Sequence, residues 1–215
     1  MSRPVLPATC QVALKEWASV LAACARGEQL VFIRKGGLIE PGSGFEFRAP
    51  HFLLYPTYEH QTVTFLRSPF QALFEEAMGH LPAAPGAAQA GKPADGHVTF
   101  ELCGEMVYAT QSRDADLLKR LEPFHIYNDA FMSQRLRWQP DQPLVIGVIR
   151  VLRLPAPVSL PLSNRYAGCK SWVELEQAVS LAGAVPVLDD AVFSERLSRI
   201  QALLKPPEAT SAVCF

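Results

Sequence analysis

The sequence predicts an α+β protein in which helices flank small antiparallel or mixed sheets. Helix-like and strand-like segments alternate irregularly along the 215 residues, and they do not repeat as a strand–helix–strand unit. Both halves also contain neighbouring strand-like runs that resemble hairpins. The apolar fraction of 49% and the charged fraction of 19% are ordinary for a globular protein, so a chain of this length can bury a core.

The first half alternates between one helix, several strands and a second helix. Leu14, Trp17 and Leu21 repeat at helical spacing, and Pro56 ends a strand-like run. Pro69 opens a segment whose apolar residues lie on one helical stripe. These patterns predict a helix over 11–26, strands over 30–35, 45–47 and 51–55, and a helix over 69–81.

The segment 82–96 differs from the rest of the chain. It is rich in Ala, Pro and Gly and has no large apolar residue, which is typical of a flexible surface loop or linker. Such a segment is either a domain boundary or an insertion at a loop tip. We favour a boundary, with an N-terminal α+β unit at 1–81 and a C-terminal α+β unit at 97–215.

The second half begins with two strand-like runs, between which Gly104 and Glu105 suggest a tight turn. Ser171 and Glu174 form a capping-box pattern before an apolar stripe, and Asp190 caps the last helix. We expect strands at 97–103, 106–110, 144–154 and 185–188, and helices at 114–121, 129–136, 171–182 and 190–204.

Composition also limits the function and the compartment. The net charge of −1 is spread evenly, so no segment has the basic excess that makes nonspecific nucleic-acid binding tight. The five cysteines are odd in number and form no CxxC pair, which argues against a disulfide scaffold and a cysteine-based zinc site. No run approaches the length of a membrane span, so we expect a cytoplasmic protein without a membrane partner. The oligomeric state stays open.

Polar groups that could do chemistry are densest between residues 31 and 61. Here Arg34 and Lys35 precede Gly36 and Gly37 at the end of a predicted strand. Consecutive glycines let backbone N–H groups point into one concavity, and two adjacent cations favour a phosphate or a carboxylate. The pattern indicates an anion site or a nucleic-acid backbone site; a glycine turn with solvated basic side chains is the alternative.

The segment from Tyr55 to Gln61 contains Tyr58, Glu59 and His60. Histidine titrates near neutrality, and a neighbouring carboxylate can raise its pKa or orient its tautomer, as a general acid or base requires. The tyrosines could stack on a base or hydrogen-bond a substrate. Adjacent residues of a strand point to opposite faces, so a Glu59–His60 dyad requires a turn. The alternative is a polar connection after a broken strand.

A third candidate is Lys170, which with Gly168 precedes the helix expected at 171–182 and makes an anion site plausible. Cys169 is a weaker candidate nucleophile, because no motif supplies its base. No histidine pair has metal-ligand spacing, and Glu46-Phe47-Arg48 has arginine where a carboxylate-metal nuclease has lysine. We therefore assign no metal site, and the sequence identifies no cofactor.

Four segments carry a resemblance: 13–17 (ALKEW), 33–37 (IRKGG), 52–61 (FLLYPTYEHQ) and 166–175 (YAGCKSWVEL). Together they resemble a bacterial family described as a domain of unknown function, over about residues 10 to 180. The resemblance implies a bacterial cytosolic protein and transfers no catalytic residue. By the order of its elements, the second half is also similar to PUA-like barrels, including the ASCH type, which bind modified bases or RNA.

Three hypotheses follow. The first is a nucleic-acid or nucleotide-binding module that uses Arg34, Lys35, Tyr58, His60 and Lys170, with nucleic acid or a phosphate-containing small molecule as its partner. The second is a hydrolase or nuclease in which His60 is the general base or acid and Arg34 and Lys35 hold a phosphate. The third is a scaffold protein in which the PTYEHQ and GCKSW segments are packing seams.

Overall fold

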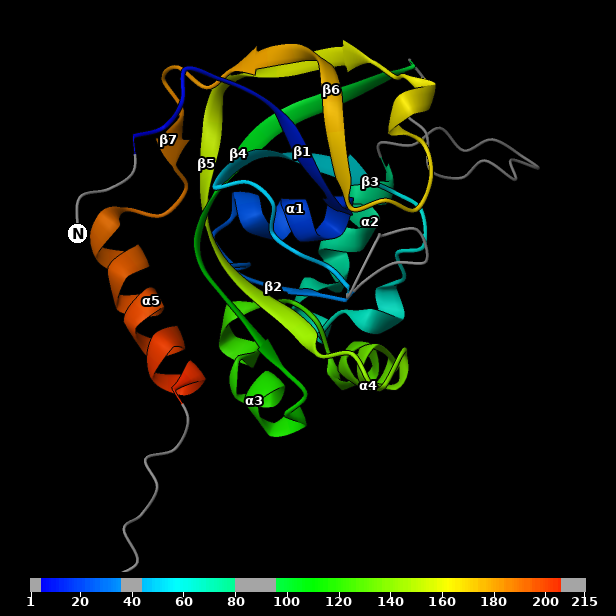
Figure 1. The fold of residues 1–215 in the computed structure, drawn as a ribbon, viewed down its shortest axis with the longest axis vertical. Coiled ribbons are helices and arrows are strands. Elements are labelled where there is room, and N and C mark those ends of the chain that lie inside the picture. The colour runs from blue at the N-terminus through cyan, green and yellow to red at the C-terminus, as the bar shows by residue number, and fades with distance from the viewer. Residues whose placement is uncertain (1–4, 36–43, 80–95, 206–215) are drawn as a thin grey trace, which may run out of the picture.

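The computed structural model describes residues 5–35, 44–79 and 96–205. Within them, seven strands form one sheet with the order β2-β5-β4-β3-β1-β6, and β7 pairs with β5 (Figure 1). The strands are β1 (Thr9–Trp17), β2 (Val31–Arg34), β3 (His51–Thr57), β4 (His97–Ser112), β5 (Leu144–Pro161), β6 (Trp172–Ser180) and β7 (Val185–Pro186). The helices are α1 (Ala18–Ala25), α2 (Gln71–Gly79), α3 (Ala115–Arg120), α4 (Asp129–Arg137) and α5 (Asp190–Leu204). The predicted α+β class is confirmed.

Strand direction decides which ends of the chain segments meet. β1 and β3 run parallel, with Trp17 opposite Thr57, whereas the other pairs are antiparallel. The carboxyl ends of β1 and β3 therefore lie at the same edge. β6 runs antiparallel to β1, with Trp172 opposite Leu14, so the residues before β6 come to that edge as well.

β4 and β5 form a long antiparallel ribbon from His97–Pro161 at one end to Ser112–Leu144 at the other. Register shifts in the ribbon bend it, as bulges do, and Figure 1 shows it curling over one end of the molecule. The sheet consequently has two cores. One cluster packs under α1 and the helices α3–α5, and a second lies inside the curl, between β1, β3, β4, β5 and β6.

The turn predicted at Gly104 and Glu105 is wrong, because β4 passes through both residues without interruption. Gly104 lies in the packed middle of the sheet. A Cβ there would meet Phe52 Cε2 at 2.8 Å and Ile149 Cγ2 at 2.9 Å. The glycine thus allows two neighbouring side chains to approach the backbone, which is a common role of glycine inside a strand.

The helix predicted over 11–26 is wrong in its first half, where β1 occupies Thr9–Trp17. β1 lies between β3 and β6 and is covered on both faces, so Ala13 packs into one core and Leu14 into the other. Apolar residues on both faces of a strand imitate the helical spacing. The helical pattern is correct from Ala18, where α1 begins.

The helix predicted over 171–182 is also wrong, and β6 takes its place. Val173 and Leu175 are buried while Glu174 and Glu176 are exposed, which is the two-residue period of a strand. The strand predicted at 45–47 is wrong too: these residues form a loop in which the Phe45 and Phe47 rings pack edge to face, 4.8 Å apart.

Other predicted elements are confirmed with shifted bounds. β2, β3, α3, α4, β7 and α5 lie where expected. A 3₁₀ turn at Ser68–Phe70 precedes α2, and further 3₁₀ turns occupy Val63–Phe65, Glu122–Phe124 and Asn164–Tyr166. β5 extends beyond the predicted end at 154, and its prolines 155 and 157 fall in the register shift between the pairs Leu102–Arg153 and Phe100–Val158. Proline has no backbone N–H, and strand pairing does not require one at a register shift.

Strands from both sides of the 82–96 segment pair with one another, since β3 pairs with β4 and β2 with β5. Residues 82–95 lie outside the described residues, and the division into two units stays a prediction. Among the described strands, pairing runs from β2 to β6 as a path with two ends, so the sheet is open and not a closed barrel. None of the described helices is long and apolar enough to cross a membrane.

Candidate functional site

A cleft of about 280 Å³ opens at the edge where β1, β2 and β3 end. The residues that line it come from five places in the chain. They are 15–17 at the end of β1, 33–35 at the end of β2, Thr57, Glu59 and His60 after β3, Arg135 on α4, and 168–171 before β6. Figure 1 shows the ends of β1, β2 and β3 near the start of β6 and the helix α4. Segments up to about 150 residues apart in sequence therefore share one concavity.

A buried ion pair lies at the floor of the cleft. Arg34 Nη1 donates to Glu16 Oε2 at 2.9 Å, and the two side chains are 16% and 5% exposed. The second Glu16 oxygen accepts the backbone N–H of Trp17 at 2.9 Å. The Arg34 guanidinium also lies over the ring of Phe45, 5.1 Å from its centroid. Removal of either partner would leave a buried charge without compensation.

Lys35 is buried beside this pair and fixes the end of α4. Its Nζ donates to the carbonyl oxygens of Arg135 at 2.9 Å and Leu136 at 3.4 Å. A cation at these last carbonyls also complements the helix dipole. Burial, and after it the charges of Arg113 and Arg135, lower the pKa of Lys35.

Two further lysines hold the wall formed by the segment before β6. Lys15 Nζ donates to the carbonyl oxygens of Tyr166 and of Gly168, the latter at 3.0 Å, and lies over the Tyr55 ring. Lys170 Nζ donates to the carbonyl oxygen of Arg165. Burial and the charge of Lys170 lower the pKa of Lys15. Because carbonyl oxygens carry no net charge, these contacts leave the positive charge of both lysines in place.

Arg135 is the fifth cation of the cleft. Its guanidinium lies over the Phe131 ring at 5.0 Å, and its Nε is buried without a hydrogen-bond partner among the described residues. Burial, followed by the nearby charge of Arg34, lowers the pKa of Arg135. Two guanidinium groups thus approach the same floor, where Glu16 neutralises Arg34.

The rim is exposed and carries Glu59, His60 and Cys169. β3 ends at Thr57, and the chain then turns, with His60 in the left-handed region at φ 60°. The turn brings both Glu59 and His60 to the cleft, as a dyad of adjacent residues requires. Gln61 anchors the turn, because its Oε1 accepts from the backbone N–H of Ser19 at 3.4 Å and from the Ser19 hydroxyl at 3.0 Å.

The model of a family described as a domain of unknown function, DUF1802, matches residues 13–199. The chain belongs to the DUF1802 family. The matched region includes each described residue of the cleft, from Lys15 to Ser171. A comparison with curated proteins finds no match. The resemblance to a domain of unknown function is thereby confirmed, whereas similarity to PUA-like barrels is not shown. The family description carries no activity, so the functional argument rests on the cleft.

The cleft of this DUF1802 protein collects most of the residues that the sequence singled out. Arg34, Lys35, Glu59, His60 and Lys170 all line it. The helix expected after Lys170 is absent, because the residue precedes β6, so the helix-dipole argument for it is wrong.

Other predicted residues lie elsewhere. Tyr55 is buried behind the cleft, its ring 5.7 Å from Phe100 and 6.2 Å from Tyr166, and burial raises its pKa to about 12. Tyr58 is half-buried and is not among the lining residues. Gly36 and Gly37 lie outside the described residues. A functional role for any of these residues stays a prediction.

Sequence reasoning missed Lys15, Glu16 and Trp17. All three lie in the ALKEW segment, which was noted for its resemblance but interpreted as a helix face. Only the pairing of β1 with β3 and β6 brings them to the cleft. The position of Arg135 in the cleft depends on how α4 packs against the end of β2, which local spacing does not show.

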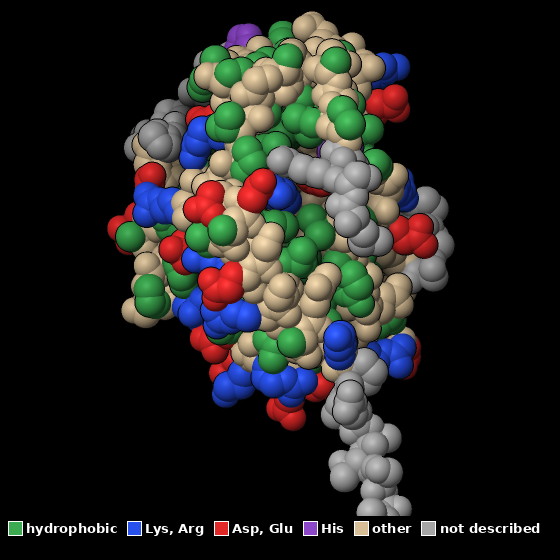
Figure 2. Space-filling model, turned by 90° about the vertical axis from the view of Figure 1, so that its left-hand side faces the viewer, with side chains coloured by type: hydrophobic (Ala, Val, Ile, Leu, Met, Phe, Trp, Pro, Cys, Tyr) green, Lys and Arg blue, Asp and Glu red, His purple; other side chains and the backbone are tan. Residues whose placement is uncertain are grey.

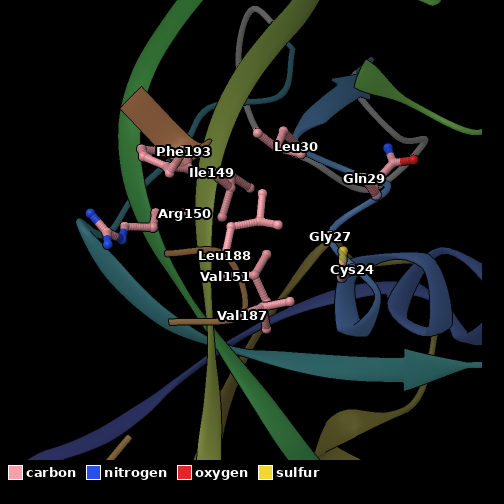
Figure 3. Close-up of a pocket in the computed structure, with 10 residues that line it drawn as sticks. All are labelled: Cys24, Gly27, Gln29, Leu30, Ile149, Arg150, Val151, Val187, Leu188 and Phe193. Carbon is pink, nitrogen blue, oxygen red and sulfur yellow. The ribbon is translucent and has the colours of Figure 1, made fainter. Parts of the chain in front are cut away.

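Two other regions of the DUF1802 protein give less support for a functional site. Figure 3 shows a second cavity, of about 10 Å³, where apolar side chains such as Ile149, Val151 and Leu188 converge. It has room for about one water molecule. On the face shown in Figure 2, acidic and basic side chains are interleaved over the lower part of the molecule. Within the described ranges, no group of three His, Cys, Asp or Glu side chains could hold a metal ion.

Proposed function

We propose that this DUF1802 protein binds a phosphate-bearing ligand of nucleotide size in the cleft. The observation that carries the proposal is the charge of the lining: of its described residues, five are Lys or Arg and two are Glu. One of the two, Glu16, already pairs with Arg34. Clefts lined by one sign of charge concentrate ligands of the opposite sign. The volume of about 280 Å³ suits a small molecule or the end of a larger one.

The way in which the lysines are held supports the proposal. Lys15, Lys35 and Lys170 each donate to main-chain carbonyl oxygens. These contacts orient the ammonium groups without cancelling their charge. Such a set of oriented cations is ready to receive an anion with little rearrangement, which lowers the free-energy cost of binding.

Fluorescence polarisation tests the proposal directly. Labelled ATP, labelled single-stranded DNA and labelled single-stranded RNA are titrated with the full chain at low and moderate salt. Lys170→Gln should weaken binding by about three- to tenfold, less than the loss of a fully buried contact, because Lys170 is half-exposed and solvent screens its charge. Lys119→Gln is the matched control, because Lys119 is an exposed lysine on α3 that does not line the cleft. Absence of binding to every probe at low salt would reject the proposal.

A second candidate function, phosphoester hydrolysis or nuclease activity, is favoured by the rim. His60 and Glu59 are exposed at the mouth of a basic cleft, and His60 has a left-handed backbone conformation. Sparsely populated backbone conformations occur often at functional sites. Under this candidate function, nucleic-acid probes incubated with the protein and magnesium are cleaved, and His60→Ala abolishes the cleavage. If the probes bind but stay intact, hydrolysis is rejected and ligand binding is the function that stands.

The scaffold hypothesis is supported for only part of the two segments. Trp172 packs its ring 5.2 Å from Phe52 and donates its indole N–H to the carbonyl oxygen of Glu46 at 2.9 Å. In contrast, His60 is exposed and Lys170 is half-buried at the cleft. His60→Ala should therefore leave the unfolding midpoint unchanged. A loss of folding on this substitution would favour the scaffold hypothesis.

A further inference from the structure

The side chains that line the cleft are buried on its inner side, the floor, and exposed at its rim. Ile33, Lys35 and Glu16 at the floor are 2%, 6% and 5% exposed. At the rim, Glu59 and His60 are exposed. A ligand therefore enters from the rim, and only a group at its end can reach the floor.

Arg135 lines the cleft together with Arg34. Its Nε is buried without an acceptor among the described residues, while its guanidinium lies over the Phe131 ring. Arg34 is already satisfied by Glu16 at 2.9 Å. The Nε atom itself has almost no surface open to a ligand, so an oxyanion in the cleft would meet the outer nitrogens of the guanidinium. There it would offset the repulsion between the Arg135 and Arg34 guanidinium groups, which both line the cleft.

We infer that the cleft accepts the terminal phosphate of a monoester, with Arg135 as its principal ligand at the floor, an inference that rests on the proposed function. A monoester phosphate carries a charge of about −1.5 to −2 at pH 7, which suits a lining with more cations than carboxylates. Guanidinium groups bind phosphate oxygens through two parallel hydrogen bonds.

An internal diester phosphate fits this floor poorly. It carries a single negative charge and a substituent on each side. Its second substituent would have to lie against the side chains of Ile33 and Glu16, which are 2% and 5% exposed. A mononucleotide and the phosphorylated end of a nucleic-acid strand share the favoured chemistry, and the experiment distinguishes them.

Isothermal titration of the full chain compares matched probes. The first pair is AMP and its methyl ester, which have the same base and sugar but differ in one ionisable oxygen. The second pair is a short oligonucleotide with a 5′-phosphate and the same oligonucleotide with a 5′-hydroxyl. We expect the member with a terminal monoester to bind at least about tenfold more tightly, as the loss of a charge-assisted contact predicts. Inorganic phosphate serves as the minimal probe.

Arg135→Gln tests the named residue, and Arg137→Gln is the matched control on the same helix. Arg137 is exposed and donates its Nε to the carbonyl oxygen of Ser133 at 3.2 Å, away from the cleft lining. We expect Arg135→Gln to weaken monoester binding by about tenfold or more and Arg137→Gln by less than about twofold. Thermal unfolding of each variant checks that it is folded. If Arg135→Gln does not fold, Arg135→Lys tests the role of Arg135 in its place. The comparison of AMP with its methyl ester on the wild-type protein then tests the preference for a monoester.

The outcomes separate this inference from the proposed function. Equal affinity for AMP and its methyl ester, or for the two oligonucleotides, would overturn the monoester inference and leave phosphate-ligand binding intact. An Arg135→Gln variant that binds as tightly as Arg137→Gln would overturn the assignment of Arg135. If none of the probes binds, both the monoester inference and the proposed function are rejected. Binding of AMP alone supports a small-molecule ligand, and binding of the 5′-phosphorylated strand alone supports a nucleic-acid end.

Discussion

A buried, neutral histidine in the larger core should make the free energy of unfolding depend on pH. His125 is 1% exposed, its Nε2 lies 3.4 Å from the carbonyl oxygen of Leu118, and its Nδ1 has no hydrogen-bond partner among the described residues. Burial is the main reason why its pKa falls from 6.5 to about 4. The unfolded chain therefore binds one more proton than the folded protein between these two values.

The sign and size of the effect follow from this difference. A depressed pKa stabilises the folded protein above pH 6.5, and the stabilisation is lost as the pH falls towards 4. One pKa unit corresponds to about 1.4 kcal/mol, so the free energy of unfolding should drop by about 2 kcal/mol between pH 7 and pH 5 from this group. The total loss approaches about 3 kcal/mol at lower pH.

Urea unfolding at several pH values measures the effect against a variant without the imidazole. His125→Phe removes the titration and keeps an aromatic ring beside Tyr127, whose ring lies 5.6 Å away. The free energy of unfolding of the wild type should fall more steeply than that of the variant between pH 7 and pH 5. Parallel profiles for the two proteins would refute the argument. Other groups titrate in both proteins, so they cancel in the difference.

Two further predictions concern stability at fixed pH. Arg34→Ala should lower the free energy of unfolding by about 3 kcal/mol, because it leaves Glu16 buried without its partner. The double variant Arg34→Met with Glu16→Leu should lose less free energy of unfolding than Arg34→Ala, and urea titration measures both variants. A larger loss in the double variant would contradict the charge argument. Gly104→Ala should cost about 1–3 kcal/mol, since its Cβ would overlap Phe52 and Ile149. A thermal midpoint equal to that of the wild type would show that these side chains move aside.

The elements that the sequence predicted correctly have patterns determined by local spacing. α3 and α4 have side-chain caps at Asp114 and Asn128, and α5 has one at Asp189, one residue before the cap expected at Asp190. β1 and β6 were predicted as helical because their burial depends on distant partners. The Ser171–Glu174 capping pattern has no helix to cap, and the Ser171 carbonyl oxygen accepts instead from the backbone N–H of Lys15 at 2.8 Å.

The candidate site was predictable in its residue types but not in its assembly. Arg34, His60 and Lys170 were chosen because cations and a histidine stood beside turns, and all three line the cleft. Nothing local shows that they meet, since that depends on β1 running parallel to β3 and antiparallel to β6. The role of Lys35 in holding the α4 carbonyl oxygens could not be foreseen either, because the contact joins residues 100 positions apart.

The chain length of a nucleic-acid ligand distinguishes end binding from binding along the backbone. The whole chain has a net charge of −1, whereas the described lining of the cleft has five Lys or Arg side chains against two Glu. A protein that tracks a single strand gains contacts with each added nucleotide, and the salt slope of its binding constant grows by about 0.7 for each phosphate contacted. A cleft that holds the terminal phosphate gains nothing from the rest of the strand. We therefore expect 5′-phosphorylated strands of about four, eight and twelve nucleotides to bind within about twofold of one another, with a common salt slope. Affinity and slope that both increase with length would indicate that the strand runs over a surface outside the cleft.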